Sequence, residues 1–310
     1  MSEHIPETTF KNFSKEQAAQ YAAGRGTSYP EPLYQAIMEY HEGKRDAVLD
    51  VGTGPGLVVL NMLKYCERGI GCDASTNMIE QAKKDAAKHG ITDRTSFSMA
   101  TAENCFEAVS EAGLSNVDII TVGTAAHWFD MPRFYVAAAE SLRPGGTLAM
   151  WCPSSFYVHP SVPHAAELQA ALSHLEDVYL KPYMQPGSLL ARSGYDDLPL
   201  PWSTEETSSL FDEKTFKREN WDRNGVPSAT PSADGTPAPF LLAQEFSTKT
   251  VSMAFASSSP VVRWREAHPD QAFTEEDPVM RTVQVMKDIL GEDAKVVAGS
   301  SLSLLLLRKN

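Results

Sequence analysis

Between residues 47 and 151, short apolar segments alternate with segments of helical pattern, and this alternation constrains the fold more than any other feature. The strands are expected at 47–51, 69–72, 95–99, 117–122 and 147–151. The helices between them are expected at 57–66, 76–89, 103–112 and 131–142. The inner strands are almost entirely apolar, which is typical of parallel strands covered by helices on both faces. The pattern predicts an α/β fold with a doubly wound, Rossmann-like and mostly parallel sheet.

The flanking regions suggest how the rest of the chain is organised. Residues 1–45 are expected to be helical, and residues 46–151 to form the core just described. Residues 152–240 are predicted to be a helical and irregular insertion, with a flexible loop rich in proline at 224–239. Residues 241–310 are predicted to complete a seven-stranded sheet. The elements expected outside the core are helices at 14–23, 32–42, 164–176, 213–223 and 275–290, and strands at 244–253 and 296–307.

The charge of the chain argues against two classes of partner. The 310 residues include 27 basic and 40 acidic side chains, a net charge of −13. Because a surface this acidic repels phosphate backbones and anionic lipids, nucleic acid and membrane are not expected as partners. A small anionic substrate is still compatible with this charge, because a few arginines can reverse the local potential. No apolar run approaches the roughly 20 residues that a membrane-spanning helix needs.

The four cysteines, Cys66, Cys72, Cys105 and Cys152, form no Cys-x-x-Cys motif and have no histidine at zinc spacing. They are expected to be buried free thiols, and no metal site is predicted. The polar N-terminus, Met1 to His4, lacks the pattern of a secretory signal. The predicted location is therefore the cytoplasm.

The segment from Asp50 to Gly56, with the sequence DVGTGPG, lies where the first strand turns into the first helix. Ligands bind at the carboxyl ends of the strands in such sheets, and glycines let the backbone touch them. A dinucleotide fingerprint needs its third glycine at the position that Leu57 occupies, so a dehydrogenase is disfavoured. Asp73 ends the second strand, where a carboxylate can bind both hydroxyls of a ribose.

The glycine loop followed by Asp73 resembles the first two motifs of class I S-adenosylmethionine-dependent methyltransferases. A narrower resemblance is to the fungal trans-aconitate methyltransferase family, which forms methyl esters of small carboxylic acids. The segments that carry it are Tyr21–Arg25 with Ser28–Pro30, Ala126–Asp130, and Pro182–Gly187. The resemblance implies S-adenosyl-L-methionine as the cofactor and a small-molecule acceptor.

Matching positions imply which residues bind the cofactor. Asp50, Gly52, Thr53 and Gly54 would hold its methionine end, and Gly123 and Thr124 would lie beside the sulfonium. Asp73 and Ala74 would bind the ribose. Met78, Thr101, Ala102 and Glu103 would surround the adenine; relatives often have aspartate at the position of Thr101, so Glu103 is expected to replace that contact. Tyr21 and Arg25 would close over the cofactor from the N-terminal helix.

Five further residues are candidates for the acceptor site. His127 follows the fourth strand, near the expected position of the methyl group, and is the predicted catalytic residue, either orienting the acceptor or acting as a base. Trp128, Tyr183, Gln185 and Arg263 are predicted to bind the acceptor. Esterification of a carboxylate is the leading expectation. Methylation of a hydroxyl, thiol or amine of a secondary metabolite is an alternative, as is a regulator that binds S-adenosylmethionine without transferring its methyl group.

Overall fold

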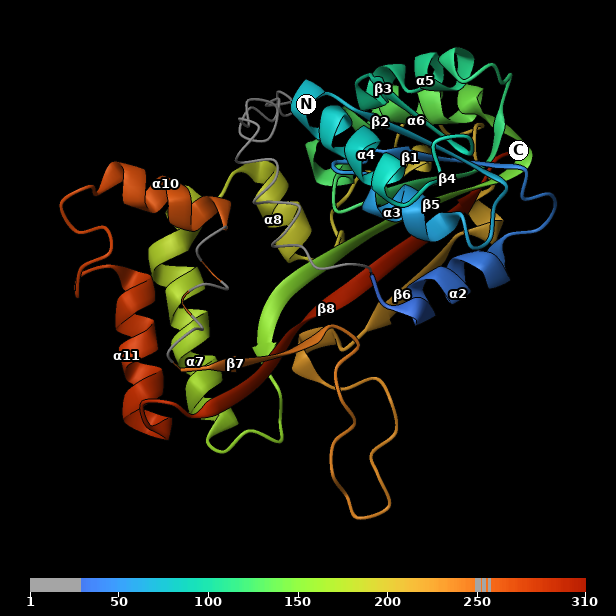
Figure 1. Ribbon diagram of the computed structural model, residues 1–310. Coiled ribbons are helices and arrows are strands. Elements are labelled where there is room, and N and C mark those ends of the chain that lie inside the picture. Colours follow the sequence, from blue (N-terminus) through green and yellow to red (C-terminus); the bar gives the residue numbers. More distant parts are fainter. Residues whose placement is uncertain (1–28, 249–251, 253–254, 256–257) are drawn as a thin grey trace. The chain divides into compact units, whose positions relative to one another are not determined.

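The computed structural model describes residues 29–248, 252, 255 and 258–310 (Figure 1). The described chain divides into two compact units. Unit 1 comprises the chain up to Cys152 together with Asp197–Glu219 and Leu304–Asn310. Unit 2 comprises Pro153–Asp196 and Asn220–Ser303. Tyr21 and Arg25 and the helix predicted over residues 14–23 lie outside the described residues.

Unit 1 contains the predicted alternation of strands and helices. Its helices are α2 (Glu31–Tyr40), α3 (Leu57–Met62), α4 (Thr76–Lys88), α5 (Phe106–Glu111) and α6 (Met131–Ser141). The strands that alternate with them are β1 (Ala47–Val51), β2 (Arg68–Asp73), β3 (Thr95–Met99), β4 (Val117–Gly123) and the first part of β5 (Leu142–Val158). The pairs β1–β2, β1–β4, β2–β3 and β4–β5 are all parallel. The predicted doubly wound, mostly parallel architecture is confirmed.

The strand order is β3-β2-β1-β4-β5-β8-β6, with β8 spanning Lys295–Arg308 and β6 spanning Lys217–Trp221. An additional strand, β7 (Ala243–Ser247), pairs antiparallel with β8 off this path, so the described residues form eight strands where seven were predicted. β3 lies at one end of the order, and its partly exposed residues fit an edge strand. β1 and β4 are central and nearly fully buried, as their apolar sequences predicted.

The prediction of a helix over residues 213–223 is wrong. A short 3₁₀ turn at Glu213–Thr215 precedes strand β6, whose sequence is KRENW. Charged residues with good helix propensity favoured a helix, but pairing with β8 at the end of the sheet outweighs that local preference. Strand β5 also begins at Leu142, earlier than the predicted residue 147, and continues to Val158. The structure also contains the short helices α8 (Pro186–Arg192) and α10 (Ser259–Ala267), which the sequence did not predict.

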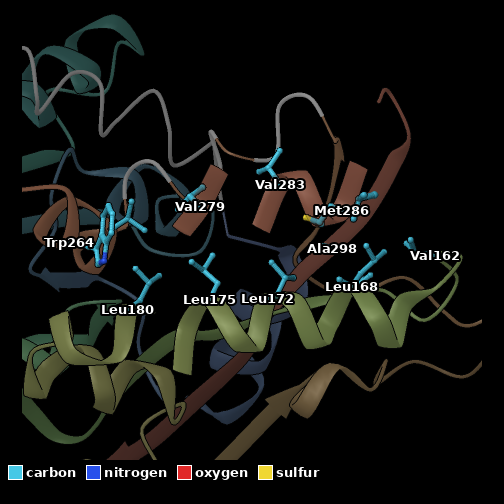
Figure 2. Close-up of a cluster of buried hydrophobic side chains, with 13 residues drawn as sticks. Val162, Leu168, Leu172, Leu175, Leu180, Trp264, Val279, Val283, Met286 and Ala298 are labelled. Atoms are coloured by element: carbon cyan, nitrogen blue, oxygen red, sulfur yellow. The ribbon is translucent and has the colours of Figure 1, made fainter. Parts of the chain in front are cut away.

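Unit 2 is built around a helical cluster of its own. Helix α7 (Ala165–His174) continues into a π-helical segment (Leu175–Leu180), and helix α11 (Pro278–Leu290) packs against both. Figure 2 shows Leu168, Leu172 and Leu175 along one side of this continuous helix, facing Val283 and Met286 of α11. Leucines three to four residues apart lie on one helix face, so the sequence itself places them together.

Short 3₁₀ turns connect the main elements. They are η1 (Ala102–Asn104), η2 (Ala126–Trp128), η4 (Lys181–Tyr183), η5 (Pro201–Ser203) and η7 (Arg223–Gly225). The loop predicted at 224–239 is irregular, and residues 226–242 contain no helix or strand. The two units group residues 197–219 with unit 1 and residues 241–303 with unit 2.

All four cysteines lie among the described residues, and each is a buried free thiol, as predicted. Burial raises the pKa of the thiols of Cys66 and Cys105 to about 12, so both remain protonated near neutral pH. Across the described ranges, no helix combines the length and apolar character needed to cross a membrane.

Candidate functional site

The loop between β1 and α3 has the geometry of a backbone ligand-binding turn. Gly52, Gly54 and Gly56 have φ angles of +69°, +52° and +83°, a region that residues with a side chain rarely adopt. A Cβ atom on Gly52 would lie 2.7 Å from that of Ala125, whereas a Cβ atom on Gly54 would have no heavy atom within 4 Å. The backbone is therefore packed against the protein at Gly52 and open at Gly54.

Asp73, at the carboxyl end of β2, is held in place by two backbone amides. Its Oδ2 atom accepts a hydrogen bond from the amide of Gly54 at 2.9 Å, and its Oδ1 atom accepts one from the amide of Ser75 at 2.8 Å. A carboxylate oxygen has more than one lone-pair site, so both atoms can still accept a hydroxyl hydrogen bond from a ribose. The residue that follows, Ala74, is half-buried beside it.

Asp50 is a buried carboxyl group in the middle of the sheet. Asp50 is only 1% exposed, and its Oδ1 atom accepts a hydrogen bond from Thr121 Oγ1 at 2.8 Å. Burial raises the pKa of Asp50 to about 7, and the nearby charge of Asp73 acts in the same direction. Asp50 is therefore partly protonated at neutral pH.

The raised pKa makes stability depend on pH in a defined direction. Between the ordinary pKa of 3.8 and about 7, folded Asp50 holds a proton that the unfolded chain has released. The free energy of unfolding must therefore fall as pH rises through this range. Relative to an Asp50→Asn variant, the wild type is expected to lose up to roughly 4 kcal/mol between pH 4 and 7. Urea unfolding of both proteins at several pH values measures this difference, and parallel pH profiles would contradict it.

The end of β4 is strained and closely packed. A Cβ atom on Gly123 would lie 2.9 Å from the ring of Trp151, and the next residue, Thr124, has a φ of +59° although it is not glycine. The Thr124 amide donates to the Trp151 carbonyl at 2.8 Å, and its hydroxyl is hydrogen-bonded to the hydroxyl of Tyr29 at 2.8 Å. Such strain is found at ligand-binding sites and persists only where the surroundings hold it.

Tyr29 is a neighbour of this site that the sequence did not single out. Its ring meets that of Trp151 edge-on, with centroids 5.3 Å apart, and its hydroxyl reaches Thr124. Tyr29 belongs to the segment Ser28–Pro30, which carried part of the family resemblance. That resemblance is the one sequence signal that could have identified it.

The residues predicted to surround the adenine differ in exposure. Met78 on α4 is 3% exposed, and Ala102 is also buried, whereas Thr101 is exposed. Glu103 Oε1 accepts a hydrogen bond from the amide of Asp130 at 3.0 Å, which ties η1 to the start of α6. Glu103 therefore has a structural contact, and the adenine contacts of these residues remain predictions.

His127 and Trp128 form the turn η2, which follows the carboxyl end of β4. Both are half-buried, and their rings lie 4.8 Å apart between centroids. The residues that flank this turn, Ala125 and Phe129, are the ones that a Cβ atom on Gly52 would meet. The fold thus brings the predicted catalytic residue, from a distant part of the sequence, to the glycine loop.

The other predicted acceptor residues lie in unit 2. Arg263 donates from Nε to the backbone carbonyl of Tyr183 at 2.8 Å, so the structure brings these two together. The Tyr183 hydroxyl lies 3.4 Å from His268 Nε2, and Gln185 is the half-buried residue that precedes helix α8. The contacts of Arg263 and Tyr183 account for their positions within unit 2, and a role in binding the acceptor remains a prediction.

Comparisons with known proteins identify the core. Residues 48–146 match the family model described as a methyltransferase domain. The chain is 34% identical over 124 residues to a putative methyltransferase of Dictyostelium discoideum, covering 40% of this chain and 43% of that protein. It is 30% identical over 158 residues to a probable S-adenosylmethionine-dependent methyltransferase of Saccharomyces cerevisiae, covering 50% of each. It thus spans about half the length of these relatives.

A match to a methyltransferase of Aspergillus candidus extends further, with 31% identity over 221 residues, 68% of this chain and 63% of that protein. Among solved structures, a putative type II methyltransferase from Anaeromyxobacter dehalogenans superposes with a TM-score of 0.63 at 20% identity, covering 91% of this chain and 97% of that one. That structure supports the fold. Residues 48–146, which include the glycine loop, thus match a methyltransferase domain, as the sequence motifs predicted.

Proposed function

We propose that the protein is an S-adenosylmethionine-dependent methyltransferase that converts a carboxylate of a small molecule into a methyl ester. One observation carries the cofactor assignment. The space beside Gly54 is open, and the amide of Gly54 donates a hydrogen bond to the carboxylate of Asp73. The domain match and the name of the yeast relative support it. The resemblance of Ala126–Asp130 and Pro182–Gly187 to trans-aconitate methyltransferases supports the carboxylate acceptor.

The residues present fit this cofactor. When bound, S-adenosylmethionine supplies a methyl group on a sulfonium, whose leaving group is already activated. The loop from Gly52 to Gly54 would hold the methionine end through backbone groups, and Asp73 would accept hydrogen bonds from the ribose hydroxyls. Gly123 and Thr124 would border the reacting centre.

The chain's task in this reaction is to align the acceptor and to exclude water. A carboxylate is ionised near pH 7 and needs no base, so His127 orients an acceptor oxygen and Trp128 forms a wall of the site. A hydroxyl or phenol acceptor would instead require His127 to remove a proton.

Transfer of labelled methyl from S-adenosylmethionine to a panel of small acids, phenols and thiols tests the proposal. Trans-aconitate belongs in the panel. The expected result is a labelled product that releases volatile methanol on mild alkaline treatment, because esters hydrolyse under these conditions. Label that stays attached after alkaline treatment would mean that the product is an ether, a thioether or an amine instead of an ester. Cofactor binding without transfer to any compound of the panel would count against the acceptor assignment and favour a regulator.

Replacing His127 with alanine is expected to lower kcat/KM roughly a hundredfold, because a misplaced acceptor loses its alignment with the methyl group. The dissociation constant of the cofactor, measured separately by calorimetry, is expected to stay within about twofold because His127 is assigned to the acceptor. His89→Ala, at an exposed histidine that follows α4, is the matched control. Unchanged turnover would remove His127 from the mechanism.

A further inference from the structure

Unit 1 has an open apolar pocket at the opposite end of its strands from Asp73. The pocket has a volume of about 310 Å³ and lies where α3 and α4 end, next to the starts of β2 and β3. The aliphatic side chains of Leu60, Leu63 and Ile91 form its apolar part. Because the glycine loop lies at the other end of the strands, the proposed function has not used this pocket.

The rim of this pocket carries positive charge. Lys64 and Arg94 line it, and both side chains are exposed. The guanidinium of Arg94 is held in place, because it donates to the carbonyl oxygens of Leu63 and Cys66 at 3.0 and 2.9 Å. Those acceptors have no net charge, and within the part of the chain that the structure describes neither Lys64 nor Arg94 forms an ion pair. A chain of net charge −13 thus keeps two unmatched cations beside an apolar pocket.

Unit 2 presents an exposed aromatic side chain in the loop that joins α10 to α11 (Figure 1). This residue, Phe273, is 73% exposed. Its φ of +64° lies in the left-handed region, which residues with a side chain seldom adopt. Strain of this kind costs free energy and persists only where the surrounding structure holds it. The loop therefore keeps Phe273 in a conformation that the residue would not adopt by itself.

Two neighbours hold Phe273 in this position. The buried carboxylate of Asp277 accepts hydrogen bonds from the Phe273 amide at 3.0 Å and from Arg265 Nε at 2.7 Å. The guanidinium of Arg265 in turn lies 4.2 Å from the centroid of the Phe273 ring and covers one of its faces. An aromatic side chain that is already fixed loses little conformational entropy when a partner binds it. Phe273 is therefore a preorganised anchor for a partner surface.

The loop around Phe273 is acidic. Asp270, Glu275 and Glu276 lie within three residues of it in the sequence, and all three are exposed. The loop sequence, residues 268–277, contains no lysine or arginine. An apolar anchor with acidic neighbours is complementary in charge to an apolar pocket with a basic rim, and such complementarity favours association of the two surfaces.

The chain thus carries both halves of one contact on two different surfaces. A volume of 310 Å³ equals the space of roughly ten water molecules in the liquid, which is enough for one phenyl ring. The pocket lies wholly within unit 1, and Phe273 and its acidic neighbours lie wholly within unit 2. A contact between two copies therefore does not depend on how the two units of one chain are placed.

We propose that the protein self-associates head to tail, with Phe273 of one copy bound in the apolar pocket of a second copy. The acidic side chains beside Phe273 then lie close to Lys64 and Arg94 of the other copy. Because the two surfaces differ, the contact is heterologous and builds rings or open chains of copies. The contact is small, so the association is weak and reversible. This proposal is independent of the proposed function.

Sedimentation velocity of the full chain at increasing concentration tests the proposal. The weight-average sedimentation coefficient of the wild type is expected to rise between about 1 and 100 µM. Phe273→Ala is expected to raise the dissociation constant about tenfold or more, because a central aromatic anchor dominates such a contact. Leu60→Glu, which places a negative charge in the pocket, is expected to do the same. Phe106→Ala, at another exposed phenylalanine, is the matched control and is expected to associate as the wild type does.

A mixture of the two defective variants distinguishes this contact from any other. Phe273→Ala retains the pocket and Leu60→Glu retains the anchor, so an equimolar mixture is expected to form a heterodimer and nothing larger. Thermal unfolding confirms that each variant is folded, and Lys64→Glu, at an exposed position of the rim, repeats the pocket test without altering the core. A wild type that stays monomeric, variants that associate as the wild type does, or a mixture that stays monomeric would each overturn the proposal.

Discussion

Replacing Asp73 with alanine is expected to weaken S-adenosylmethionine binding by roughly a hundredfold or more. Hydrogen bonds to a charged acceptor contribute about 1.5–3 kcal/mol each, and the ribose offers two hydroxyl donors. The substitution also removes the acceptor for the amides of Gly54 and Ser75, at 2.9 and 2.8 Å, so the glycine loop loses its fixed position beside β2. Cofactor affinity is thus lowered through the lost contact and through the disordered loop.

Titration calorimetry on the folded variant measures this loss. Asp73→Asn keeps one carbonyl oxygen as an acceptor and is expected to fall between the alanine variant and the wild type. Asp93→Ala, at an exposed aspartate after α4, removes the same charge away from the loop and is expected to bind normally. If Asp73→Ala bound the cofactor as tightly as Asp93→Ala, the ribose assignment would be wrong.

Replacing Leu175 with alanine is expected to destabilise unit 2 by about 2–5 kcal/mol. Leu175 is 0% exposed in the cluster that joins the α7 region to α11, with Leu172, Val279 and Val283 among the other members (Figure 2). Its removal leaves a cavity between two helices whose backbones are fixed by many other contacts, so the space cannot close fully. The loss therefore includes the transfer free energy of the side chain and the cost of the cavity.

Hydrogen exchange followed by mass spectrometry reports this effect in peptides from α7 and α11. Leu189→Ala is the matched control, because Leu189 on α8 is 43% exposed and its truncation should cost no more than about 0.5 kcal/mol. Exchange protection that falls equally in both variants would mean that the cluster does not hold these helices together.

The core of unit 1 could be predicted because short stretches of sequence determine each of its elements. An apolar strand, a glycine loop and a helix follow one another within residues 47–62, and each signal is contained in a few neighbouring residues. The strand β6 could not be predicted, since its sequence KRENW has no apolar alternation and its state depends on pairing with β8, far away in the sequence. The grouping of residues 197–219 with unit 1 depends on such distant contacts as well.

In the candidate site, too, the features set by local sequence could be predicted, and those that depend on distant contacts could not. The positions of Asp50, Gly52, Gly54 and Asp73 follow from the strand ends on which they lie. The hydrogen bond between Tyr29 and Thr124 joins residues 95 positions apart and has no pattern of its own.

The path of the chain between the units also has a consequence for biosynthesis. The last segment of unit 1, Leu304–Asn310, follows all residues of unit 2 in the sequence. A ribosome therefore completes every residue of unit 2 before it makes the end of β8, which lies beside β5 in the sheet order. Until then β5 lacks its neighbour β8, and an unpaired strand edge is a template for pairing with other chains.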